Sequence, residues 1–130
     1  MGEEKVTQAA YKDLVVWEKS MVFANLVISL TENLETDRKH FRLIEQLEAA
    51  ATSVPMNIAE GKGRYSNKEF IHFLHIARGS LFETMTLLEL FEMRSWIKAE
   101  QMLEMTNQAD EIGRMINGLI RSLEKRAHSS

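Results

Sequence analysis

The chain has 130 residues, which suits a single domain, and its net charge is −3 at pH 7. It contains no cysteine, so disulfide bonds and thiolate metal sites are excluded. A domain built mainly to hold nucleic acid usually shows a basic excess, and the whole-chain charge gives none. Residues 1–10 do not resemble a signal peptide, and no apolar stretch reaches the ~20 residues of a membrane span. We therefore expect a cytoplasmic protein.

Two helices are predicted in the first half of the chain. The first covers residues 11–32, and its apolar face recurs at three- and four-residue steps: Leu14, Trp17, Met21, Ala24 and Ile28. Val22, Leu26 and Leu30 widen that face. The second covers residues 38–60, with Asp37 as its N-cap. Its apolar face is formed by Phe41, Ile44, Leu47, Ala51, Val54 and Ile58. Pro55 should kink this helix without ending it, because the apolar pattern continues past the proline. Gly61 and Gly63 then end it.

Two further helices are predicted in the second half. A capping box from Ser66 to Glu69 opens the third helix, which extends to residue 93. Its apolar face is formed by Phe70, Phe73, Ala77, Leu81, Thr84, Leu88 and Phe91. Ser95 is the predicted N-cap of the fourth helix, over residues 96–125, and residues 126–130 form a frayed tail. The face of the fourth helix is formed by Leu103, Thr106, Gly113, Ile116, Ile120 and Leu123.

Short connections between long helices make neighbouring helices antiparallel. The sequence therefore predicts an all-α, up-down-up-down antiparallel four-helix bundle, one domain over residues 1–130 with an ordered core of about 11–125. The third and fourth helices also carry apolar residues away from their main faces: Ile71, Leu74, Leu87, Leu90, Met102, Met105 and Met115. These residues favour a second buried face, and hence a homo-oligomer, although a broad apolar face in a thick bundle is the alternative.

Two groups of polar residues have a spacing that could serve metal or ligand binding. Glu69, His72 and His75 have the three-residue spacing of helical metal ligands, but only one such element exists and Glu69 already serves the capping box. We therefore expect no metal, no cofactor and no small-molecule substrate. The second group is a polar seam: Ser53, Asn57, Glu60 and Arg78. It can fix helix register or form a ligand pocket, with Glu60 paired to Arg64 or to Arg78.

The seam contains no nucleophile–base pair, so no catalytic residue is expected and the protein is predicted not to be an enzyme. Beside it, Gly79 and Ser80 lie inside the third helix, where glycine is unfavourable. We expect these two small residues to let another helix approach closely.

Basic residues form two clusters that an antiparallel bundle brings to one end. The first cluster, which also contains Tyr65, is Lys62, Arg64 and Lys68; the second is Arg121, Lys125 and Arg126. In an oligomer these residues would form a positive ring able to bind the phosphates of RNA or DNA. The alternative is that they are ordinary cations at helix C-termini.

Several motifs resemble one known family. They are Asp13-Leu14-Val15-Val16-Trp17, Gln46-Leu47, Ser53-Val54-Pro55-x-Asn57-Ile58-Ala59-Glu60-Gly61, Arg64-x-Ser66-x-Lys68-Glu69-Phe70 and Ile76-Ala77-Arg78-Gly79-Ser80-Leu81. The chain resembles, over about residues 11–123, the four-helix-bundle proteins encoded in intervening sequences of bacterial large-subunit ribosomal RNA genes. The accessory protein of diversity-generating retroelements, a pentameric partner of a reverse transcriptase, is similar.

The resemblance implies a left-handed up-down bundle, commonly a homopentamer, without enzymatic activity. Two features depart from the pattern. Glu48 and Ala49 stand where members often carry a basic pair, and the chain is acidic whereas the retroelement accessory type is strongly basic. We accordingly expect an interaction or accessory protein of RNA or ribonucleoprotein, with direct nucleic-acid binding through the basic end as the alternative.

Overall fold

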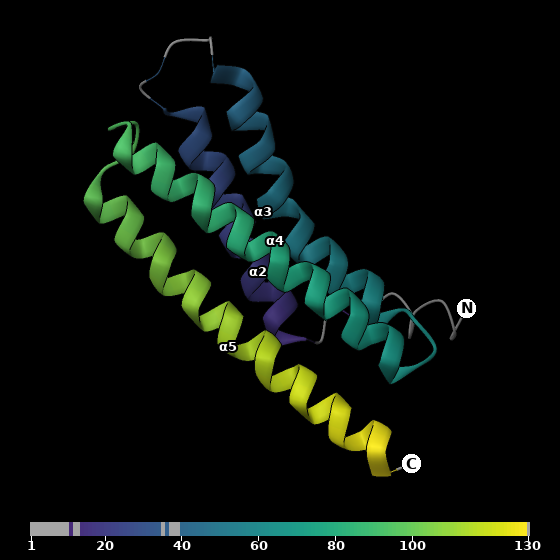
Figure 1. The fold of residues 1–130 in the computed structure, drawn as a ribbon. Helices are drawn as coiled ribbons and strands as arrows, with labels where there is room; N and C mark the ends of the chain where they lie inside the picture. The colour runs from purple at the N-terminus through teal and green to yellow at the C-terminus, as the bar shows by residue number, and fades with distance from the viewer. Residues whose placement is uncertain (1–10, 12–13, 35, 37–39, 130) are drawn as a thin grey trace.

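The computed structural model describes residues 11, 14–34, 36 and 40–129, and within them it contains four helices (Figure 1). These are α2 (Val15–Glu32), α3 (Phe41–Lys62), α4 (Asn67–Met93) and α5 (Ala99–Ser129). Each helix packs against the next one in the chain, and α2 contacts α5 to close the ring. The predicted all-α antiparallel four-helix bundle is confirmed.

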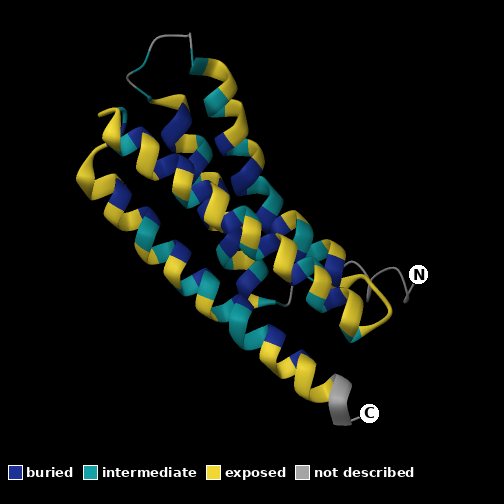
Figure 2. Ribbon diagram, in the orientation of Figure 1, coloured by how far each residue is buried: buried dark blue, intermediate teal, exposed yellow. Residues whose placement is uncertain are grey.

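One apolar core runs through the bundle, and Figure 2 shows the buried residues facing inward on all four helices. Four of the seven residues assigned to a second apolar face belong to this core: Leu74, Leu87, Met102 and Met105. Ile71 and Met115 are partly buried against the same core, and Leu90 is 39% exposed. The bundle itself therefore uses most of these side chains, and their number is not an argument for a second buried face.

The buried face of α2 differs from the prediction. Phe23 and Val27 are completely buried, whereas Met21 is 46% exposed. Of the predicted set, Ala24 and Leu30 lie on the buried face, which consists of Val16, Ser20, Phe23, Ala24, Val27, Leu30 and Thr31. The cause is that α2 is apolar on nearly every side, so that a period of 3.6 residues fits more than one face.

Helix α3 begins at Phe41 rather than at residue 38, and the predicted N-cap Asp37 lies outside the described residues. The helix continues past Pro55, as expected, and ends at Lys62. Gly61 is inside the helix and buried, so it does not end α3. A Cβ atom on Gly61 would stand 2.7 Å from Cβ of Phe73 and 2.9 Å from Cδ1 of Phe70. Glycine at this position therefore lets α4 approach α3 closely.

Helix α4 begins with the predicted capping box. The Ser66 hydroxyl oxygen accepts the backbone N–H of Glu69 at 3.1 Å, and the Glu69 carboxylate accepts from that hydroxyl at 3.3 Å. The cap satisfies one of the backbone donors that the first turn leaves without a helical partner. The start of α4 is thereby fixed at the turn that follows α3.

The connection from α4 to α5 corrects the assignment of Ser95 as an N-cap. Ser95 has φ 64° and ends α4 in the left-handed conformation, with its N–H donated to the Glu92 carbonyl at 2.9 Å. The N–H of Trp96 bonds the Phe91 carbonyl at 2.9 Å, and the two rings pack edge to face. This is a Schellman motif with serine in the place usually held by glycine. Helix α5 starts later, at Ala99, and extends to Ser129, beyond the predicted end at 125.

Candidate interaction surfaces

A hydrogen-bonded polar network joins α3 to α4. The Ser53 and Ser80 hydroxyls lie 2.8 Å apart, and Asn57 Nδ2 donates to both the carbonyl and the hydroxyl oxygen of Ser53 at 2.8 Å. The side chains of Ser53 and Asn57, one turn apart on α3, and of Ser80 on α4 thus bond to one another. Such an arrangement fixes the register of two helices, which is the structural interpretation of the seam.

Glu60 and Arg78 do not belong to that network. Glu60 forms an ion pair of 2.6 Å with Arg64 on the surface, which selects one of its two predicted partners. Arg78 instead donates to Asn117 Oδ1 on α5 at 2.7 Å. Glu60 nevertheless lines one cavity of about 460 Å³ together with Ser53 and Asn57. Of the predicted four-residue seam only Arg78 lies elsewhere, because helical periodicity turns it toward α5 and not toward α3.

The three residues weighed as metal ligands have separate surroundings. Glu69 serves the cap of α4, and the His72 ring packs against Phe73 with ring centres 5.5 Å apart. Nδ1 of His75 lies 3.0 Å from Nη2 of Arg78, and since arginine only donates, Nδ1 accepts. Within the described part of the chain, no group of three or more His, Cys, Asp or Glu side chains is placed to hold a metal ion.

The two basic clusters lie at the same end of the bundle, as predicted: the α3–α4 turn and the C-terminal end of α5 are at the lower right of Figure 1. The guanidinium of Arg64 stacks over the Phe73 ring at 4.8 Å and is paired with Glu60. Lys62 lies over the Phe70 ring at 5.8 Å. Lys68, Arg121, Lys125 and Arg126 are exposed. Tyr65, at the tip of the turn, is fully exposed.

The outer face of α4 carries exposed apolar side chains, of which the sequence predicted only Leu90 to lie away from the main apolar face. Phe82 is 61% exposed and Met93 81%, and Ile76 and Leu90 are each 39% exposed. Gly79 lies among them, and a Cβ added there would meet no described atom within 4 Å. The predicted close approach of another helix is therefore absent at Gly79 within the described part of one copy, whereas Ser80, predicted together with it, contacts Ser53 on α3. The signal available in the sequence was that Phe82 falls outside the apolar stripe of its own helix.

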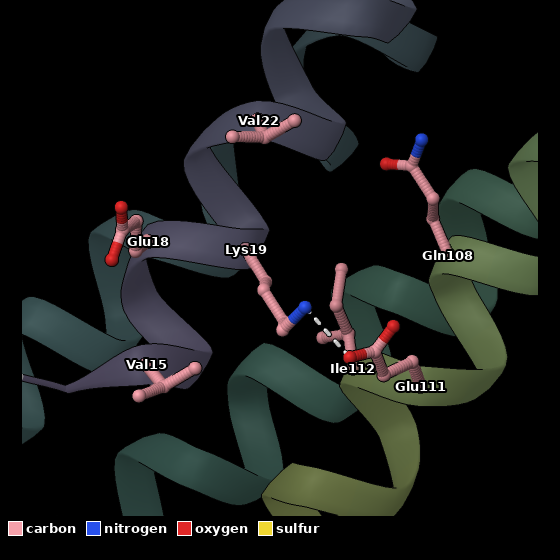
Figure 3. A pocket seen from close by; sticks show the side chains of 7 residues that line it. All are labelled: Val15, Glu18, Lys19, Val22, Gln108, Glu111 and Ile112. Carbon is pink, nitrogen blue, oxygen red and sulfur yellow. Dashed lines mark ion pairs between the residues drawn. The ribbon is translucent and has the colours of Figure 1, made fainter.

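A groove follows the seam between α2 and α5, the least extensive contact between neighbouring helices. At one end is a cavity of about 380 Å³, lined by Val15, Glu18, Lys19, Val22, Gln108, Glu111 and Ile112. The Lys19 ammonium reaches across it to Glu111 at 2.7 Å, beside Ile112 (Figure 3). A second cavity, of about 230 Å³, is lined by Leu26, Ser29, Leu30, Asn33, Gln101, Glu104 and Met105.

The fold and its surfaces define a small helical-bundle protein whose notable features are exposed apolar faces and a basic end. The family model of the 23S rRNA-intervening sequence proteins matches residues 12–118, and the chain belongs to that family. A solved structure from Bacteroides thetaiotaomicron VPI-5482, described as a protein with unknown function from the S23 ribosomal protein family, is 32% identical to the chain, with a TM-score of 0.76. That similarity covers 82% of this chain and 98% of the other. No curated protein matches. None of the described helices is long and apolar enough to cross a membrane.

Proposed function

We propose that this chain is a non-enzymatic, homo-oligomeric, cytoplasmic interaction protein that serves as an accessory to RNA or ribonucleoprotein. The observation that supports self-association best is the outer face of α4. Phe82, three residues from Gly79, and Met93, at the end of the helix, expose most of their apolar surface, while the opposite face of α4 is packed in the core. Exposed apolar surface of this kind favours an interaction site.

The glycine strengthens this argument. Glycine inside a helix costs about 1 kcal/mol relative to alanine, and in a single copy Gly79 gains no contact that would offset the cost. A second copy that crosses α4 at Gly79 would make use of the missing side chain. The family resemblance implies that the assembly is a pentamer.

Light scattering on the purified protein over a range of concentrations tests self-association. The expected result is a mass that is a whole-number multiple of the 15.0 kDa chain. A mass of one chain at every concentration would contradict the proposal.

Direct nucleic-acid binding at the basic end is the second candidate. It is favoured by the full exposure of Tyr65 at the turn that carries Lys62 and Lys68. Exposed aromatic rings stack on unpaired bases and lysines contact phosphates, a combination typical of single-strand binding. The second basic cluster, at the end of α5, adds positive charge at the same end of the bundle.

Titration of fluorescent single-stranded RNA and DNA at two salt concentrations tests this candidate. We expect binding that weakens as salt increases, because phosphate contacts release counterions. Tyr65→Ala should weaken binding at both salt concentrations, and Lys62→Ala should also reduce the salt dependence. Absence of binding at low salt, or binding untouched by both variants, would eliminate it.

A further inference from the structure

The two cavities between α2 and α5 follow one another along the same face of α2. The lining residues recur at three- and four-residue steps from Val15 through Val22, Leu26 and Leu30 to Asn33, as one face of a helix requires. The groove therefore extends about 27 Å along α2, at 1.5 Å per residue. Val15 is 54% and Val22 57% exposed, so apolar surface on its wall is in contact with solvent.

The exposed ridge of α4 matches this groove in length. Both carry exposed apolar side chains among polar ones, which are Glu83 and Thr86 on the ridge and Glu18 and Lys19 in the groove. From Ile76 to Met93 the ridge extends about 26 Å. It consists of protruding apolar side chains around Gly79, where a facing helix meets only backbone. The ridge and the groove lie on different helices of the same chain, so one copy can offer its ridge to a second copy while its own groove stays available.

We propose that the α4 ridge of one copy fills the α2–α5 groove of the next copy, with Phe82 and Val22 in the contact. This inference rests on the proposed self-association and assigns its surfaces. The contact is heterologous, since two different surfaces meet, and repeating it generates a closed ring when the rotation between copies closes.

Charge and direction agree with this pairing. Helices α2 and α4 run in the same direction in an up-down-up-down bundle, so in a ring whose axis follows the helices the start of α4 faces the start of α2. His75 is exposed near the start of α4, and because its Nδ1 accepts from Arg78, a neutral ring has its N–H at Nε2. Near the start of α2, Glu18 lines the groove and offers a carboxylate acceptor, whereas the Glu111 carboxylate beside it is already paired with Lys19.

The same arrangement places the basic ends of all copies on one side of the ring. Copies related by rotation about an axis parallel to their helices keep the same end up. Lys68, Arg121 and Lys125 would then be repeated around one rim, where a nucleic-acid backbone could contact several copies at once.

Cross-linking tests the assigned surfaces, because the natural chain contains no cysteine to interfere. The variants are Val22→Cys, Phe82→Cys and the double variant, each treated with a short bis-maleimide and compared with Leu103→Cys. Leu103 is 63% exposed on α5 and lies outside both the ridge and the groove cavities. Circular dichroism of each untreated variant checks that the fold is kept.

The double variant should give a ladder of covalent multimers, and each single variant should stay one chain, as should Leu103→Cys. Dimers of Phe82→Cys alone would show that two ridges meet each other, which overturns the inference but keeps self-association. A double variant that light scattering shows to be oligomeric, yet that does not cross-link, also overturns it. If light scattering gives the natural protein the mass of a single chain, that result contradicts the inference and the proposed function together.

Discussion

The two opposite seams of this bundle are built differently. Along α3 and α4, Gly61 admits Phe73 and Phe70 at van der Waals distance, and the hydroxyls of Ser53 and Ser80 are hydrogen-bonded. Between α2 and α5, by contrast, two cavities follow one another along the helices. The ion pair of Lys19 and Glu111, which is partly exposed, connects the two helices across the first cavity. The α3–α4 seam is closed by the packing at Gly61 and by the hydrogen bond between the two serines. Its cavity of about 460 Å³ is lined by residues of α3 alone, among them Ser53 and Asn57. The α2–α5 cavities are instead lined by residues of both helices, so it is the α2–α5 seam that has room between its two helices.

The contrast separates a seam that contributes to the stability of the single chain, α3–α4, from a seam whose surface is available for contact with another molecule, α2–α5. Tight packing without voids contributes most to stability, and exposed ion pairs contribute little. Substitutions should therefore have large effects on folding at the α3–α4 seam. At the α2–α5 seam and on the ridge of α4 they should act mainly on assembly.

The largest effect is expected for Gly61→Ala. The added methyl group would lie 2.7 Å from Cβ of Phe73, an atom that cannot move without its backbone, so α3 and α4 must separate. Overpacking of this kind costs about 1–3 kcal/mol in the free energy of unfolding. Urea denaturation followed by circular dichroism measures it, and an unchanged midpoint would show that the seam is loose.

Gly79→Ala makes the same chemical change as Gly61→Ala, but on the exposed outer face of α4. In a monomeric background such as Phe82→Glu, alanine should raise the free energy of unfolding by up to about 1 kcal/mol, because it favours the helix and meets no described atom within 4 Å. In the natural chain the same change should weaken assembly, because it adds a methyl group at the contact between copies. Urea denaturation and dilution-dependent light scattering separate the two effects. Stabilisation with unchanged assembly would remove Gly79 from the contact.

Ser53→Ala should lower the free energy of unfolding by about 1 kcal/mol, since the hydroxyl that bonds Ser80 and Asn57 is lost in a half-buried position. Thr52→Ala is the control, because the Thr52 hydroxyl bonds the carbonyls of Glu48 and Ala49 in its own helix. Equal losses for the two variants in urea denaturation would mean that the link between helices contributes nothing beyond a local bond.

The smallest effect is expected at the other seam. Lys19 and Glu111 are 43% and 46% exposed, so their pair should contribute less than about 1 kcal/mol. A double-mutant cycle with Lys19→Gln and Glu111→Gln, made in the monomeric Phe82→Glu background where the groove is open, measures the coupling, which should diminish in 1 M salt. A coupling of several kcal/mol would show that the pair is a principal tie between α2 and α5.

The sequence predicted the fold and most of α3 and α4 because their apolar residues mark one face each and Ser66 marks a start. It failed on α2, where Met21 and Val22 are as apolar as the buried Phe23, so only packing against the other helices selects the face. Ser95 was misassigned because a serine beside a helix end serves as N-cap in most sequences, and here it takes the left-handed position instead.

The surfaces were harder to predict than the fold. Ser53 and Asn57 were recognised as a polar link, but their partner Ser80 is distant in sequence and became evident only from the packing of α4. Of the ridge, the sequence indicated Leu90 but not Phe82, although Phe82 falls outside the apolar stripe of its own helix. The shared position of the basic clusters, by contrast, followed directly from counting helix directions.

The most direct test of the central claim, that the α4 ridge is buried between copies, compares Phe82→Glu with Leu103→Glu. The two side chains are equally exposed in one chain, at 61% and 63%, so a general effect of surface charge would act on both alike. Light scattering should give the mass of a single chain, 15.0 kDa, for Phe82→Glu and the mass of the natural assembly for Leu103→Glu. Identical masses for the two variants would contradict the account.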